Sequence, residues 1–108
     1  MAATAQHNDR PAPEWDLQEV RRILQDKLRG YSVRLYLFGS RARGDAGRTS
    51  DIDVAILPKT SLPDGLLAEI REALEDSQVI YRVDLVDLST APEALRDKIL
   101  SQGILWND

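Results

Sequence analysis

The chain has 108 residues, of which 43% are hydrophobic and 30% charged, with 14 Lys+Arg against 18 Asp+Glu. That length favours one domain, and the net charge of -4 excludes the basic surface typical of a general nucleic-acid binder. Without cysteine the chain has no disulfide, thiolate nucleophile or cysteine-based zinc site. It contains no apolar run of membrane-spanning length and no charged-then-apolar leader. We therefore expect a cytoplasmic protein without a membrane segment.

The first 13 residues differ in composition from the rest of the chain. They are small, polar and contain two prolines, so we predict a disordered N-terminal arm over residues 1–13. Residues 14–108 are predicted to form one domain. The only histidine, His7, lies in the arm, and we expect it to be solvated and without a role.

Helical and strand patterns alternate along the predicted domain. Apolar residues at helical spacing predict an amphipathic helix of about four turns, from Glu14 to just before Gly30. Trp15 and the leucines of this helix are expected to lie in the core. Runs rich in β-forming residues predict three strands, over residues 33–38, 51–57 and 79–88.

Two further helices are predicted in the second half of the chain, over residues 62–75 and about 92–102. We expect Ser89 or Thr90 to cap the last helix, and the apolar residues 104–106 to fold back onto the core. The order of elements is therefore helix, strand, strand, helix, strand, helix.

Three aspartates lie in predicted strands, where a core would exclude charge. Asp51 and Asp53 are two residues apart, so their carboxylates project from the same face of one strand. Like charges held this close repel, and a divalent cation between them relieves the repulsion. If the strand that carries Asp84 neighbours residues 51–57, its carboxylate can reach the same pair of metal ions. Three carboxylates on two neighbouring strands suit a two-metal displacement at phosphorus.

A phosphate-binding segment is predicted where the first strand ends. Gly39 lets the backbone approach phosphate oxygens, and the Ser40 hydroxyl and the start of a short helix there can donate to them. Arg43, four residues after Gly39, is placed for a forked contact with the same phosphates. Arg41 and Arg48 are weaker candidates for this contact.

Each of these features also has an ordinary structural explanation. A Gly-Ser pair after a strand is usually only a turn, and two alternate aspartates can belong to the solvated face of an edge strand. Arginines in a loop are most often exposed or paired with nearby carboxylates. The three features together are far more specific than any one of them, and they favour a nucleotide site.

The combination resembles the nucleotidyltransferases of the DNA polymerase β superfamily, and more closely their minimal nucleotidyltransferase (MNT) domains. The similar segments are F-G-S-R-A-R-G from residue 38, S-D-I-D-V from residue 50 and V-D-L from residue 83. The similarity spans about residues 16–106. It implies an α/β fold, a small mixed β-sheet flanked by helices like the palm of polymerase β, which agrees with the order of elements.

The resemblance also implies roles for individual residues. The catalytic carboxylates would hold two Mg²⁺ ions and are Asp51, Asp53 and Asp84, the last also helping to activate the acceptor hydroxyl. The residues that bind the nucleotide, with ATP as substrate, would be Gly39, Ser40, Arg43 and Ser50. Larger relatives, such as the aminoglycoside nucleotidyltransferases, carry an extra domain for the base or the acceptor, and we expect none here.

Three functions fit these observations. The one we favour is Mg²⁺-dependent transfer of AMP from ATP to a hydroxyl of a partner protein. MNT domains are typically paired with helical HEPN proteins, often as antitoxins, which implies a tyrosine of a HEPN toxin as acceptor. The second function is a binding module that neutralises a basic partner by complex formation, which the acidic charge suits. The third is nucleotidyl transfer to a small molecule such as an aminoglycoside, for which a homo-oligomer would have to build the pocket.

Overall fold

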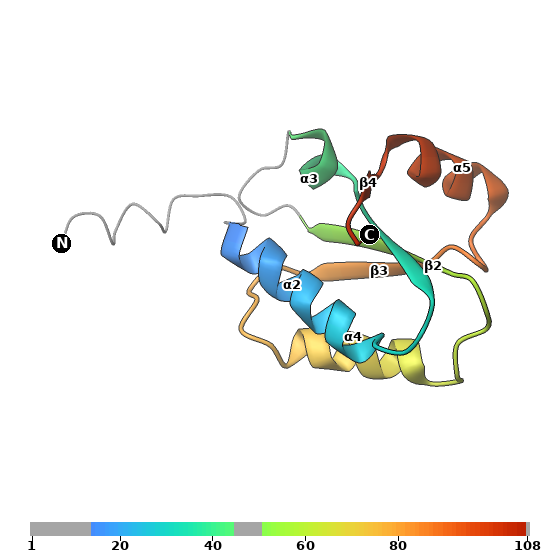
Figure 1. Ribbon diagram of the computed structural model, residues 1–108. Coiled ribbons are helices and arrows are strands. Elements are labelled where there is room, and N and C mark those ends of the chain that lie inside the picture. Colours follow the sequence, from blue (N-terminus) through green and yellow to red (C-terminus); the bar gives the residue numbers. More distant parts are fainter. Residues whose placement is uncertain (1–13, 45–50, 108) are drawn as a thin grey trace.

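The computed structural model describes residues 14–44 and 51–107. Its elements are α2 (Glu14–Lys27), β1 (Val33–Phe38), α3 (Ser40–Arg43), β2 (Ile52–Pro58), α4 (Leu66–Glu75), β3 (Val83–Asp87), α5 (Glu93–Gln102) and β4 (Ile104–Leu105). Figure 1 shows them in colours that follow the sequence. The predicted arm over residues 1–13, with His7, lies outside the described residues. In the described ranges, no helix combines the length and the apolar character needed to cross a membrane.

A mixed sheet forms the centre of the molecule, and its strand order within the described ranges is β3-β2-β1-β4. β1 and β2 run antiparallel, with Phe38 opposite Asp53. β2 and β3 run parallel, with Asp53 opposite Asp84, and the segment that contains α4 provides the crossover that a parallel pair requires. The two-residue β4 pairs with β1 in the antiparallel sense. The prediction of a small mixed sheet flanked by helices is confirmed.

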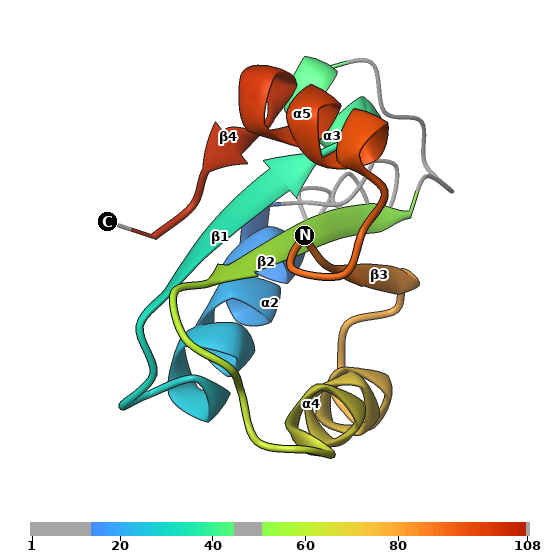
Figure 2. The ribbon, with the colours of Figure 1, turned by 90° about the vertical axis from the view of Figure 1, so that its right-hand side faces the viewer.

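Helices cover both faces of this sheet. Figure 2 shows α2 and α4 on one side and α5 on the other. The residues of β2 that pack with α2 and α4 are fully buried, and they are Ile52, Val54 and Ile56. Ala55 lies in a second cluster with Ile99 of α5. Each large apolar side chain buried in this way contributes about 1.5–3 kcal/mol. Because side chains alternate along a strand, Asp53 shares the α5 face of the sheet with Ala55.

The last helix begins differently from the prediction. α5 starts at Glu93, and no side chain caps its first turn, so the predicted cap by Ser89 or Thr90 is wrong. Both hydroxyls bond instead to Asp87 at the end of β3. The Ser89 hydroxyl donates to Asp87 Oδ1 (2.6 Å), and the Thr90 hydroxyl donates to the Asp87 carbonyl (3.3 Å). These contacts build a turn between β3 and α5, and the helix follows it.

Some apolar residues are less buried than expected. Trp15 lies in the first turn of α2 and is 51% exposed, so its prediction as a core residue is wrong. Ile104 and Leu105 do fold back against the sheet, but they remain 47% and 46% exposed because β4 is an outer strand. Trp106 packs against the main core. In addition, β3 is shorter than residues 79–88, and α4 begins four residues after position 62.

The end of the chain is tied to β1 by a side chain that continues the ladder of β4. The Trp106 amide donates to the Leu35 carbonyl (2.7 Å). The Asn107 side chain accepts from the Leu35 amide through Oδ1 (2.6 Å) and donates from Nδ2 to the Val33 carbonyl (3.0 Å). Asn107 therefore satisfies backbone groups of β1 beyond the last residue of β4.

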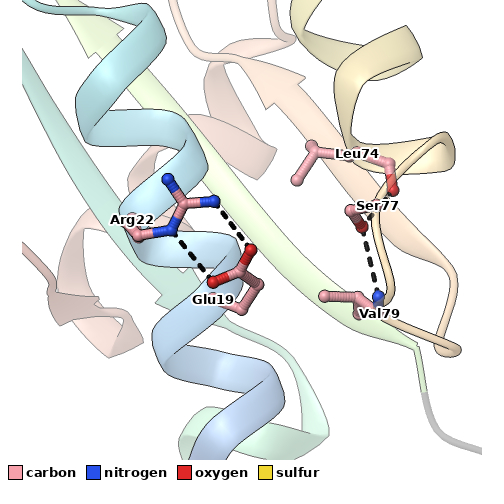
Figure 3. A network of polar contacts seen from close by, with 5 residues as sticks. All are labelled: Glu19, Arg22, Leu74, Ser77 and Val79. Atoms are coloured by element: carbon pink, nitrogen blue, oxygen red, sulfur yellow. Dashed lines mark hydrogen bonds and ion pairs between the residues drawn. The ribbon is translucent and has the colours of Figure 1, made fainter.

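A serine fixes the exit from α4. The Ser77 hydroxyl donates to the Leu74 carbonyl (2.6 Å) and accepts from the Val79 amide (3.2 Å) (Figure 3). The same view shows Arg22 paired with Glu19 through two hydrogen bonds of 3.0 and 2.7 Å on α2. This second contact is exposed and contributes little to stability. The serine contact directs the chain from α4 towards β3.

Candidate active site

The fold brings two of the predicted carboxylates to facing positions on neighbouring strands. Asp53 of β2 is the register partner of Asp84 of β3, so the condition for Asp84 to lie near the other two carboxylates, that its strand neighbours β2, is met. Asp51 directly precedes β2, two residues from Asp53. Asp84 is the most exposed of the three, on the strand that ends the sheet order. The three aspartates lie on the face of the sheet that α5 covers, at the end of the sheet where β1 finishes.

The environment of Asp53 disfavours its negative charge. Burial raises the pKa of its carboxyl above the usual range, and repulsion from Asp84 and then from Asp51 raises it further. The charges of Arg41 and Arg43 act in the opposite direction and lower this pKa. Three carboxylates and two guanidinium groups therefore form one electrostatic unit around Asp53.

The chemistry of this unit fits a hard divalent cation. Carboxylate oxygens are the ligands that Mg²⁺ prefers, usually one or two together with substrate phosphates, and a cation would relieve the repulsion that raises the pKa of Asp53. The described residues do not, however, contain a group of three or more acidic or histidine side chains already gathered as a metal site. The three carboxylates thus occupy neighbouring positions, but their oxygens are not gathered around one metal position.

Gly39 connects β1 to α3 and lies against the carboxylate of Asp53. Its backbone has φ 74° and ψ -157°, a region that essentially only glycine adopts. A Cβ added at Gly39 would overlap Asp53 Oδ2 and lie 3.1 Å from Asp53 Cγ. The glycine predicted to let phosphates approach is therefore also required for the position of Asp53.

The short helix after Gly39 presents the predicted phosphate-binding residues. α3 runs from Ser40 to Arg43, and the amides of Ala42 and Arg43 both donate to the Gly39 carbonyl (3.1 Å). A helix of four residues has only a small dipole, so charge for an anion must come mainly from Arg43. Ser50, the remaining predicted nucleotide-binding residue, and Arg48 lie outside the described residues.

Arg41 also connects α3 to Tyr81, which precedes β3, and to Asp16 of α2. Its guanidinium carbon lies 4.8 Å from the centre of the Tyr81 ring, a cation–π distance. Burial raises the pKa of Asp16 on α2, whose carboxyl is only 5% exposed, and the charge of Arg41 opposes this rise in part. The contacts of Arg41 with Asp16 and Tyr81 were not predicted from the sequence, because both residues lie in ordinary segments far along the chain from Arg41.

Comparison with known proteins gives consistent results along most of the chain. The model of the family described as polymerase beta, nucleotidyltransferase, matches residues 18–106. A probable protein adenylyltransferase MntA of Haemophilus influenzae is 37% identical over 84 residues, covering 78% of this chain and 72% of that protein. The protein adenylyltransferase MntA of Shewanella oneidensis is 36% identical over 86 residues. The match covers 79% of this chain and 60% of the Shewanella protein.

Solved structures show the same fold. A minimal nucleotidyltransferase aligns with a TM-score of 0.68 at 30% identity, covering 84% of this chain and 92% of that one. A toxin–antitoxin with AMP-PNP aligns with a TM-score of 0.64 at 33% identity (82% and 73% covered). A third structure holds a tri-AMPylated Shewanella oneidensis HEPN toxin in complex with an MNT antitoxin. It aligns with a TM-score of 0.65 at 28% identity (88% and 72% covered).

Proposed function

We propose that this chain, which belongs to the polymerase β nucleotidyltransferase family, transfers AMP from ATP to a hydroxyl group of a partner protein. The observation that carries the proposal is the facing pair Asp53 and Asp84, with Asp51 beside it and Gly39 against it. The names of two relatives as protein adenylyltransferases support a protein acceptor. The tri-AMPylated HEPN toxin of the related complex supports a HEPN toxin as that acceptor. The chain would then act as an antitoxin.

The metal ions in this proposal are two Mg²⁺ held by Asp51, Asp53 and Asp84. When bound, Mg²⁺ neutralises charge on the phosphates and lowers the pKa of the attacking hydroxyl. The repulsion among the three carboxylates supports this assignment, because it raises the pKa of Asp53 and would be relieved by cations.

The other residues of the site would hold and orient the two substrates. Gly39, Ser40 and Arg43 would bind the phosphates of ATP, with Ser50 as a further contact predicted from the sequence. The related toxin–antitoxin structure with AMP-PNP supports ATP as the nucleotide. Asp84 lies on an outer strand and is exposed, so the hydroxyl of a large partner can reach it. An ATP-dependent reaction of this kind suits the cytoplasm.

Transfer can be tested with ATP labelled at the α-phosphate, Mg²⁺ and a HEPN toxin as acceptor. We expect label on the toxin, and a gain of about 329 Da for each AMP added (the mass of the transferred group in this phosphoryl-transfer chemistry). Asp53→Asn should lower the rate by about 1,000-fold, which corresponds to roughly 4 kcal/mol of lost stabilisation of the transition state. Asp97→Asn changes an exposed carboxylate of α5 and should leave the rate unchanged.

The alternative, neutralisation by complex formation alone, gives a different result. A folded variant carrying both Asp51→Asn and Asp53→Asn would still neutralise the toxin at equal dose if binding were sufficient. We expect this double variant to bind the toxin without protecting against it. Full protection by the double variant, or undiminished transfer by Asp53→Asn, would contradict the proposed function.

A further inference from the structure

A cavity of about 160 Å³ lies between α3 and α5, directly beside the Gly39 turn. α3 contributes Arg43 and α5 contributes Lys98 to its lining, and the described residues that line it include no carboxylate. An anion in this space would lie between the two basic side chains and would be attracted by both.

The cavity and the carboxylates lie on either side of the same glycine. A Cβ added at Gly39 would overlap the Asp53 carboxylate, and Gly39 also lines the cavity. Asp53 is on the sheet face that α5 covers, and α3 and α5 lie next to each other above that face (Figure 2). A chain of phosphates at Gly39 would therefore have carboxylates, and any cations they bind, at one end and two basic side chains at the other.

The size of the cavity limits what it can hold. A volume of about 160 Å³ is smaller than the roughly 300–1,000 Å³ of pockets that enclose a whole ligand. It has room for one part of a nucleotide. Its apolar walls, which include Leu95 and Ile99 of α5, carry no charge that would compete with the two cations for a bound anion.

We propose that Lys98 is a nucleotide-binding residue that, together with Arg43, binds the terminal phosphates of the nucleotide in this cavity. The inference rests on the proposed function, since it takes ATP as the nucleotide, and it makes α5 part of the nucleotide site. The ammonium group of Lys98 supplies charge-assisted hydrogen bonds to phosphate oxygens. Its contribution therefore depends on the number of phosphates present.

Calorimetric titration of the whole chain with ATP, ADP and AMP in Mg²⁺ tests the assignment without any acceptor. Lys98→Gln should weaken ATP binding about tenfold, equivalent to about 1.4 kcal/mol, and should change AMP binding by less than about twofold because AMP lacks the terminal phosphates. Lys98→Arg should keep most of the affinity. Arg96→Gln is the matched control, because Arg96 is an exposed cation of α5 that does not line the cavity.

The possible outcomes separate this inference from the proposed function. Equal losses for ATP and AMP, an unchanged affinity of Lys98→Gln for ATP, or no binding of ATP by the unmodified chain would each overturn the role of Lys98. Circular dichroism should show that Lys98→Gln is folded, as expected for an exposed side chain. A phosphate-dependent loss in Lys98→Gln, combined with no AMP transfer to a HEPN toxin, would support the role of Lys98 and overturn the proposed function instead.

Discussion

One residue of the candidate site, Gly39, meets two structural requirements: a backbone conformation for glycine and space for a neighbouring carboxylate. Gly39 has a backbone conformation close to exclusive to glycine, and its missing side chain leaves the space that the Asp53 carboxylate occupies. A phosphate that approaches the Gly39 backbone is thereby brought beside an acidic side chain. Under the proposed function, Gly39 would thus determine how closely phosphates and carboxylates meet.

Gly39→Ala should destabilise the chain and abolish transfer. We expect the free energy of unfolding to fall by about 3 kcal/mol, because strain at a glycine-only conformation adds to overlap with Asp53. Gly44→Ala is the control, since Gly44 also has positive φ (82°) but an added Cβ there meets nothing within 4 Å. Its cost should be only about 1 kcal/mol of backbone strain. Urea denaturation measures both values, and equal costs would show that the overlap with Asp53 is unimportant.

Asp53→Asn should make the metal-free chain more stable at pH 7, although we expect it to slow transfer strongly. Burial, Asp84 and Asp51 raise the pKa of Asp53, so the folded chain binds this proton more tightly than the unfolded chain does. The contribution of Asp53 to stability therefore falls as the pH rises from its ordinary pKa of 3.8 through the raised value.

The size of this effect is limited by the partial exposure of Asp53. We expect a gain of less than about 1 kcal/mol for Asp53→Asn at pH 7, which should disappear below the ordinary pKa of 3.8. Urea denaturation in EDTA at both pH values measures the difference between the variant and the unmodified chain. A variant that is less stable at pH 7 than the unmodified chain would contradict the argument.

At the scale of elements, the pattern of the sequence predicts which segments form helices and strands but not where each one ends. The strands over residues 33–38 and 52–58 lie close to their predicted positions, because alternation and β-forming residues are local signals. The end of β3 and the start of α5 depend on hydrogen bonds between side chains and backbone near Asp87. Hydrogen bonds of this kind compete with regular secondary structure, and the spacing of hydrophobic residues does not indicate where they form.

Asn107→Ala tests whether the last described residue holds the outer edge of β1. The substitution removes two hydrogen bonds, to the Leu35 amide and the Val33 carbonyl, and leaves partly buried groups of β1 without these partners. We expect the free energy of unfolding to fall by about 1–2 kcal/mol. Ser101→Ala removes one exposed contact to a backbone carbonyl and should cost less than about 0.5 kcal/mol. Similar small effects for both variants would argue against this role of Asn107.

For the molecule as a whole, the site was predictable where its residues lie close together in the sequence. The Gly39-Ser40 segment and the pair Asp51 and Asp53 are short motifs, so the sequence alone indicates them. The pairing of Asp53 with Asp84 depends on which strands become neighbours, and the sequence left that as a condition. The proposed role of Lys98 could not be predicted, because nothing in its own helix indicates that α5 packs beside α3.

The overall charge leads to a prediction about nucleic acids. With 18 acidic against 14 basic residues, the chain lacks the cationic surface that releases counterions from a phosphate backbone. Fluorescence anisotropy with a labelled single-stranded RNA and a labelled DNA duplex should show no saturation up to about 100 μM protein at about 150 mM salt, the weak end of non-specific binding. Micromolar binding that weakens steeply with salt would contradict this prediction.

The parallel pairing of β2 and β3 also governs the order in which the site can assemble. β1 and β2 are separated by residues 39–51, whereas β2 and β3 are separated by residues 59–82, and shorter connections close faster. The antiparallel pair that carries Asp53 can thus form before the strand of Asp84 joins it, and α5 follows later still in the chain. A partly folded chain would hold Asp51 and Asp53 without Asp84 beside them, and the cavity between α3 and α5 would not yet have formed. Under the proposed function, we would then expect transfer only after β3 has paired with β2 and the site is complete.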